Sequence, residues 1–291
     1  MDYLIHILSM AGIFAILALS LDLLVGLGGM MSLATGVFFG IGAYSTALLV
    51  KAGWPMAAAM LAGMGLATLL SLFVALPAIR IRGVYLLIVT IAVQMVFTTV
   101  AQNWRSVTGG DAGVSNIPPI AIFELKLRGV AFLALVLGSC AALWWLLRRI
   151  AGSPFGRVLR AIRDDEAGAT SLGKHATATK LATFGLSACV AAYAGSLYAH
   201  YTSYIDPHSF NISLSILVLL MVMLGGAGTL LGPMLGALVL ILLPEALKFL
   251  PLPHGIAPAL RQFSYGALLV AVVFLRPQGL LGKAPPSRPS H

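Results

Sequence analysis

The chain has 291 residues, of which 59% are hydrophobic and only 9% are charged, and its formal net charge is +9. Soluble domains hold roughly 45–50% apolar and about 25% charged residues, so this composition excludes an ordinary soluble domain and indicates a polytopic membrane protein. In such a protein the positive charge indicates basic cytoplasmic loops, so no nucleic-acid partner is expected.

Apolar windows recur along nearly the whole chain at the length of about 20 residues that a helix needs to cross the hydrocarbon. In chain order they cover residues 3–25, 32–50, 54–79, 83–104, 129–147, 181–203, 213–245 and 258–275. The window 213–245 is too long for one helix, and its glycines from Gly225 to Gly232, followed by Pro233, predict a tight turn between two shorter helices. We therefore expect an all-α polytopic integral membrane protein with about 8–10 transmembrane helices.

The first two windows raise separate questions. The N-terminus lacks a positive n-region and a small-residue cleavage site, so the first window is expected to be retained as a span. The window 32–50 is rich in Gly, Ser and Thr, which leaves open whether it crosses the membrane or re-enters, and with it the side of the N-terminus. Residues 1–280 are expected to form a single transmembrane domain, followed by a short basic tail at 281–291.

One large polar stretch, 148–180, fixes the expected orientation. It holds seven of the chain's eighteen basic residues, so we predict that it is cytoplasmic. Counting outward from it places Arg80, Arg82 and the C-terminal tail on the cytoplasmic side, and residues 102–128, 203–212 and 251–257 on the outer side.

Part of this stretch, GATSLGKH at 168–175, has the glycine spacing of a nucleotide-binding P-loop. Its last residue is His175, where a P-loop needs a Ser or Thr hydroxyl to hold Mg²⁺, and the residues before it read as a polar helix instead of a strand. The chain itself is therefore not expected to bind ATP. Because Cys140 and Cys189 lie in predicted spans, no disulfide framework and no metal site are expected either.

The polar stretch also predicts an amphipathic helix. Ser153-Pro154 is a capped helix start and Gly173 a helix stop. We expect an apolar face made by Val158, Ala161, Ile162 and Ala169, and a charged face that includes an i, i+4 pair between Arg160 and Asp164. Such a helix is either a solvated connector or a docking element for another protein, and periodicity alone does not decide between them.

Small residues at fourfold spacing predict close helix packing in the membrane. The pairs formed by Gly36 with Gly40, and by Gly228, Gly232 and Gly236 in turn, let helix backbones approach closely, and such turns are also places where rigid units can slide past each other.

Polar side chains inside the spans carry their own predictions. Thr90, Gln94 and Thr98 share one helix face and predict either interhelical hydrogen bonds or the lining of a translocation route. Asp22, the acid closest to a span interior, is expected to cap backbone or reach the interface instead of relaying protons.

A family resemblance joins these observations. The segment GRVLRAIRDDEAGATSLGKHATATKLATFGLSA, residues 156–188, resembles the cytoplasmic coupling segment of ATP-binding cassette importer permeases. Four further stretches resemble the permeases of high-affinity branched-chain amino acid importers, in particular the LivM-type subunit: LDLLVGLGGMMSLATGVFFGIGAYSTALL (21–49), IRGVYLLIVTIAVQMVF (81–97), TGGDAGV (108–114) and LGGAGTLLGPMLGALVLILLPE (224–245). LRPQGLLG at 275–282 is similar to the family's C-terminal end, so the resemblance covers most of the chain in the family's order.

The resemblance implies a non-catalytic permease subunit with a cytoplasmic coupling helix, in the bacterial inner membrane. Its implied partners are a second, LivH-type permease, two cytoplasmic ATPases that bind ATP and Mg²⁺, an external substrate-binding protein and membrane lipid, with no cofactor on this chain. The implied ATPase-coupling residues are Arg157, Arg160, Arg163, Asp164, Asp165, Glu166 and Gly173. The TGGDAGV loop would belong to the outer face that receives the binding protein.

The implied translocation pathway involves Met30, Ser32 and Thr35 together with the polar face at 90, 94 and 98. Met30 and Thr35 stand where the family pattern has Gln and His, so the substrate could be leucine, isoleucine or valine, or instead urea, a short amide or another amino acid.

Two other functions remain as alternatives. An ion-coupled secondary transporter usually carries ionisable residues deep in its spans, and these are scarce here. An integral membrane enzyme would need a catalytic constellation, and the sequence holds no HExxH, no GxSxG and no clustered His or carboxylate set within a span.

Overall fold

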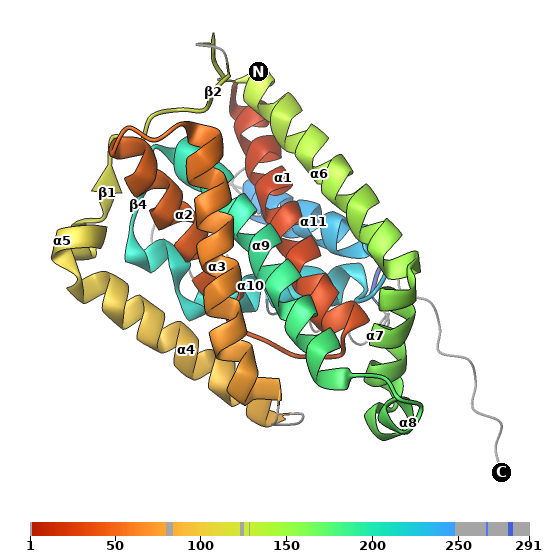
Figure 1. Cartoon of the computed structure of the whole chain (residues 1–291). Helices are drawn as coiled ribbons and strands as arrows, with labels where there is room; N and C mark the ends of the chain where they lie inside the picture. Colours follow the sequence, from red (N-terminus) through yellow and green to blue (C-terminus); the bar gives the residue numbers. More distant parts are fainter. Residues whose placement is uncertain are drawn as a thin grey trace.

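The protein is a bundle of helices, shown as a computed structural model in Figure 1, which describes residues 2–79, 84–122, 125–127, 129–247, 266 and 279–281. The long helices are α1 (Asp2–Asp22), α2 (Thr35–Lys51), α3 (Met56–Ile79), α4 (Val84–Asn103), α6 (Val130–Gly152), α9 (Ala176–Thr202), α10 (Ile212–Gly225) and α11 (Leu231–Leu247). The connecting elements are the π-turn η1 (Leu23–Leu27), α5 (Arg105–Thr108), η2 (Gly110–Ala112), β1 (Val114–Ser115), β2 (Ala121–Ile122), β3 (Leu125–Lys126), α7 (Pro154–Asp164), α8 (Glu166–Ser171), β4 (Tyr204–Ile205) and η3 (Pro207–Phe210). The all-α membrane fold predicted from the sequence is confirmed.

Five helices of the described residues are long and apolar enough to cross a membrane. They are Tyr3–Leu27, Met56–Leu76, Tyr85–Asn103, Val130–Gly152 and Ala176–Thr202, and three shorter apolar helices, Thr35–Lys51, Ile212–Gly225 and Leu231–Leu243, accompany them. Every predicted window within the described residues therefore holds a helix, and 213–245 is indeed two. Apart from residue 266, the predicted window 258–275 lies outside the described residues, as do the tail residues 282–291 and Arg80 and Arg82.

Two helices, α1 and α9, form the centre of the bundle. About two thirds of each apolar window is buried inside the protein, against about a quarter for α3, α4 and α6, which turn their outer faces to lipid. Small residues bring the centre together, because a Cβ on Gly195 of α9 would lie 1.9 Å from the carbonyl oxygen of Phe39 in α2. Backbone-to-backbone packing of this kind drives helix association in lipid, where burial of apolar surface gives no advantage.

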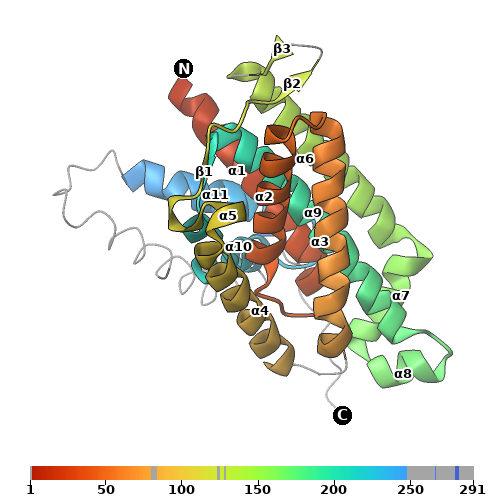
Figure 2. The same cartoon turned by 60° about the vertical axis from the view of Figure 1, so that its left-hand side comes forward.

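The segment after α1 crosses the molecule from one end to the other. Gly26, at the end of α1, contacts Arg163 of α7, whereas Lys51, at the end of α2, donates a hydrogen bond from Nζ to the carbonyl oxygen of Ser115 in β1, 2.8 Å away. The α7–α8 pair and β1 lie at opposite ends of the bundle in both views (Figures 1 and 2). Residues 28–34 and α2 therefore run together from one end of the bundle to the other, and α2 is one of the shorter apolar helices.

The two helices of the C-terminal hairpin, α10 and α11, meet at a glycine turn. A segment more than 50 residues later in the chain binds the end of α10. Leu280 and Leu281 donate their backbone N–H groups to the carbonyl oxygens of Leu224 and Gly225, at 2.8 and 3.0 Å. These carbonyls end α10 and have no partner within the helix, so the segment 279–281 acts as its C-terminal cap.

Candidate coupling and translocation site

The polar connection between α6 and α9 folds into two short helices where the sequence predicted one. Ser153 caps α7 by accepting a hydrogen bond from the N–H of Gly156, and Pro154 begins the helix, as expected. At Asp165 the backbone becomes extended, with φ −152° and ψ 102°, and the Asp165 side chain accepts from the N–H of Gly168 to start α8. An Asp that caps a following helix interrupts the preceding one, and Gly173, with φ +75°, ends α8.

The apolar face of the α7–α8 pair differs in part from the prediction. Ile162 and Ala169 are buried against Ala176 of α9, and Val158 packs on the same cluster. Ala161, which was assigned to this face, is exposed, and Leu159 is buried in its place. Leu159 packs into the main core cluster, whereas Ile162 and Ala169 form a separate small cluster, so the two helices do not bury one continuous stripe.

The helices α7 and α8, which carry most of the residues predicted to couple to an ATPase, lie at one end of the bundle (Figure 2). Arg157, Asp164, Asp165 and Gly173 are exposed, while Arg160 and Glu166 are half-buried. Asp164 pairs with the adjacent Arg163 at 3.1 Å, so the predicted pair with Arg160 is wrong. Glu166 pairs instead with Lys180 of α9 at 2.6 Å, which ties α8 to the central helix.

An exposed apolar side chain on the same surface escaped the sequence analysis. Leu172, between α8 and α9, is 79% exposed and stands beside exposed charged residues. In the sequence Leu172 is a single leucine in a polar stretch, and periodicity does not show whether such a leucine is buried or exposed.

Arg163 of α7 forms a hydrogen bond to the π-turn that follows α1. Its Nη1 donates a hydrogen bond to the carbonyl oxygen of Gly26 at 2.6 Å. Its aliphatic stem lies on Gly29, where an added Cβ would be 2.4 Å from the Arg163 Cγ. Gly29 has φ +65°, a conformation that favours glycine.

The glycine turn between α10 and α11 packs against the same point. A Cβ on Gly26 would lie 2.2 Å from the backbone nitrogen of Gly228, so the two backbones touch. Asp22, fully buried at the end of α1, accepts hydrogen bonds from the N–H groups of Gly228 and Leu230 at 2.6 and 3.2 Å. Asp22 thus caps backbone, as predicted.

The spaced glycines meet different neighbours. Gly232 and Gly236 of α11 face the α10 backbone, where added Cβ atoms would lie 2.3 Å from the Gly225 oxygen and 1.9 Å from the Met221 oxygen. Gly228 lies in the turn before α11, so the helical fourfold spacing applies only to the other two. Gly36 and Gly40 face the side chains of Gln94 and Phe97 in α4, not another helix backbone.

The polar face of α4 binds the start of two helices. Thr90 Oγ1 accepts from the N–H of Leu33 at 3.1 Å, and Gln94 Nε2 donates to the carbonyl oxygen of Phe210 at 2.6 Å. Ser215 of α10 donates to Gln94 Oε1 and accepts from the N–H of Gly36, which joins the first turns of α2 and α10 to the middle of α4. These are the interhelical bonds that the sequence allowed; a role in translocation stays a prediction.

The other predicted pathway residues lie around this point. Ser32 accepts from the N–H of Ala34, and buried Thr35 begins α2. Thr98 bonds only its own helix, through the carbonyl oxygen of Gln94. Met30 is buried in a separate apolar cluster with Leu24, Ala75, Leu86 and Phe184. The structure therefore brings Ser32, Thr35, Thr90 and Gln94 near one another and places Met30 nearer the end of α1.

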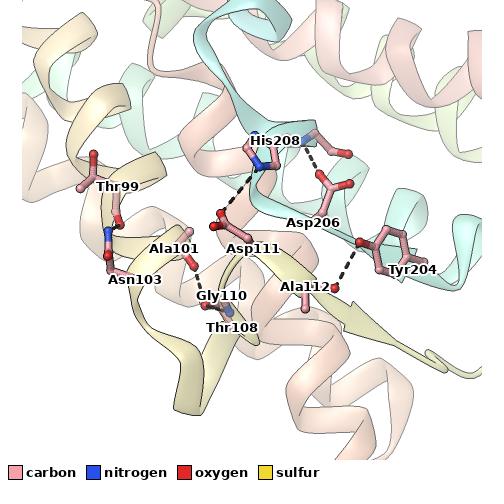
Figure 3. Close-up of polar contacts among 11 residues, drawn as sticks. Thr99, Ala101, Asn103, Thr108, Gly110, Asp111, Ala112, Tyr204, Asp206 and His208 are labelled. Carbon is pink, nitrogen blue, oxygen red and sulfur yellow. Dashed lines mark hydrogen bonds and ion pairs between the residues drawn. The ribbon is translucent and has the colours of Figure 1, made fainter.

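The opposite end of the bundle is built around the TGGDAGV segment (Figure 3). Thr108 Oγ1 donates to the carbonyl oxygen of Ala101 at 2.6 Å and accepts from the N–H of Gly110, which fixes the turn after α5. β1 pairs antiparallel with β4, and Asp111 lies 3.7 Å from the Nε2 of His208. Two loops about 90 residues apart, one after α4 and one after α9, thus form one surface.

Comparison with known proteins identifies the family. A family model described as "Branched-chain amino acid transport system / permease component" matches residues 3–273, and the chain belongs to this family. The chain is 32% identical to the high-affinity branched-chain amino acid transport system permease protein LivM of Salmonella typhimurium and 31% identical to that of Escherichia coli, over 98% of this chain and 71% of each relative. It is 27% identical to a probable LivM of Methanocaldococcus jannaschii, over 72% of this chain and 63% of the relative. No solved structure matches.

Proposed function

We propose that this chain is the membrane-spanning, non-catalytic permease subunit of an ATP-driven importer for branched-chain amino acids or a related small amino acid or amide. The family and the multi-pass helical fold support it, and the names of its relatives state branched-chain amino acid transport. The observation that carries the ATP-driven part is the α7–α8 pair: α7 is strongly amphipathic and exposes Arg157 and Asp164, and Leu172, which follows α8, is exposed as well.

The α7–α8 pair is the proposed docking surface for a cytoplasmic ATPase. A groove on the ATPase would cover Leu172, with Arg157 and Asp164 at its polar rim. This assignment makes the 148–180 region and the C-terminus cytoplasmic, in agreement with the basic residues there.

The surface at the other end then faces outward. The paired β1 and β4, together with η2 and Asp111, form the proposed receiving face for a substrate-binding protein. ATP hydrolysis belongs to the two ATPases, and a second permease of the same family completes the transport route. An ion-coupled transporter would use a buried acid such as Asp22 to bind its ion. Here the Asp22 carboxylate accepts hydrogen bonds from two backbone N–H groups, which supports the ATP-driven mechanism.

The test is uptake of radiolabelled leucine into proteoliposomes that hold this chain with its ATPases, second permease and binding protein, each omitted in turn. We expect uptake that needs ATP and every component. Uptake by this chain alone under an ion gradient would overturn the proposal in favour of a secondary transporter. ATP-dependent assembly without leucine uptake would keep the importer and reassign its substrate, with Met30 and Thr35 the first residues to examine.

A further inference from the structure

One contact joins the α7 helix to the π-turn at the end of α1. Arg163 belongs to α7, yet its guanidinium donates to the carbonyl oxygen of Gly26, 137 residues earlier in the chain. The side chain is only 38% exposed, because its stem is packed on Gly29. α7 therefore has a fixed polar link to the end of α1 in addition to its apolar packing.

The π-turn at the end of α1 makes this carbonyl available. Within η1 and the turn after it, the carbonyl oxygens of Leu23, Leu24 and Val25 accept from the N–H groups of Gly28, Met30 and Gly29. The Gly26 oxygen accepts from Arg163. π-turns inside helices occur frequently at functional sites, and a carbonyl released from the helical ladder is a natural acceptor for a charged donor.

The same point touches the C-terminal hairpin. Gly26 packs directly on Gly228, and the nearest side-chain atom to the Cβ position of Gly228 is Nη1 of Arg163, at 3.8 Å. Asp22, one turn before Gly26, holds the N–H groups of Gly228 and Leu230. Arg163 is therefore linked to the end of α1 through Gly26 and to the α10–α11 turn through the Gly26–Gly228 contact.

We propose that Arg163 is the positioning residue that transmits movement of α7 to α1 and to the α10–α11 hairpin, through its hydrogen bond to the π-turn carbonyl of Gly26. The proposal rests on the proposed function, in which a cytoplasmic ATPase displaces α7. It separates two tasks within the α7–α8 pair: Leu172, after α8, and the exposed charges hold the ATPase, and Arg163 of α7 passes its motion inward. A guanidinium suits this task, because it is always charged and its planar fork is pre-organised for hydrogen bonding.

The experiment compares Arg163→Gln, Arg163→Lys and the wild type in the complete importer, reconstituted with both permeases, the ATPases and the binding protein. Three quantities are measured for each: the ATPases that copurify, the rate of ATP hydrolysis with loaded binding protein, and leucine uptake. Arg149→Gln is the matched control, since it removes the same charge from the same end of the bundle, where Arg149 stacks on Trp145 and does not contact η1.

For Arg163→Gln we expect normal assembly, continued ATP hydrolysis, and a ratio of leucine transported to ATP hydrolysed at least about tenfold lower, the factor that one hydrogen bond to a charged group is worth. Arg163→Lys keeps a charged donor of similar reach and should recover part of that ratio, while Arg149→Gln should keep all of it.

Two results would overturn the proposal. One is a ratio in Arg163→Gln within twofold of the wild type. The other is a loss of uptake that parallels a loss of assembly in both Arg163 variants, because Arg163 would then only hold α7 in place. Failure of the proposed function looks different, since the wild-type complex itself would then show no ATP-dependent uptake.

Discussion

The close contact between α10 and α11 predicts that a side chain at Gly236 destabilises the protein. A Cβ placed there would lie 1.9 Å from the carbonyl oxygen of Met221, while real Cβ atoms essentially never come within 3.0 Å of another heavy atom. The obstacle is backbone, so no change of rotamer can relieve it. Gly236→Ala therefore requires the two helices to separate by about 1 Å at this point.

That separation sets the expected magnitude. A gap of 0.5–1 Å forfeits roughly a quarter to a half of the dispersion energy of each contact, and overpacking a core costs about 1–3 kcal/mol. We expect Gly236→Ala to lose about 3 kcal/mol of stability, near the upper limit because the clash is with backbone, which lowers the unfolding midpoint by roughly 6–12 °C.

The assay is thermal unfolding in detergent, followed with a thiol-reactive fluorescent dye, because Cys140 is buried and Cys189 is partly buried within membrane helices. Gly138→Ala in α6 is the control: a Cβ there would meet nothing within 4 Å, and alanine is favoured over glycine in a helix by about 1 kcal/mol. If Gly236→Ala and Gly138→Ala unfold within 2 °C of each other, the close approach of α10 and α11 does not stabilise the protein and the reasoning is refuted.

Four further changes have expected outcomes. Gly232→Leu forces α10 and α11 apart and should abolish leucine uptake; full uptake would contradict this. Asp22→Asn turns an amide donor toward one of two buried backbone N–H groups and should cost about 1–3 kcal/mol by thermal unfolding. Gln94→Leu breaks bonds to two other elements and should cost about 1–2 kcal/mol, whereas Thr98→Ala, which bonds only its own helix, should cost less; equal losses would argue against the interhelical role. Leu172→Glu should reduce ATPase copurification without changing the unfolding midpoint, because this side chain is 79% exposed.

The membrane helices could be predicted from the sequence because the bilayer sets their length. Every window of about 20 apolar residues within the described part became a helix, and the glycines at 225–232 correctly divided the last one. The amphipathic helix beginning at Ser153-Pro154 was also predictable, since capping is local chemistry.

The contacts that connect these helices could not be predicted. Arg163 and Gly26 are 137 residues apart, and the sequence around either residue does not indicate that the two are in contact. The sequence around Asp165 is compatible with one continuous helix or with a break at which Asp165 caps a second helix. The free energies of the two conformations differ by only about 1 kcal/mol, so the tertiary contacts determine which one forms. Gly42 of α2 and Gly195 of α9, which let these two helices pack closely, are far apart in the sequence. They lie in different helices, so they form no fourfold-spaced glycine pair that the sequence could reveal.

The cap supplied to α10 by Leu280 and Leu281 has a consequence for biogenesis. A ribosome that has just synthesised α10 has more than 50 residues still to add before these amides exist, so the last turn of α10 must wait in the translocation machinery with its carbonyls bound to water or to another partner. The hairpin can therefore reach its final form only after synthesis of residue 281, and a chain that stalls earlier presents the quality-control proteases with an unfinished helix end.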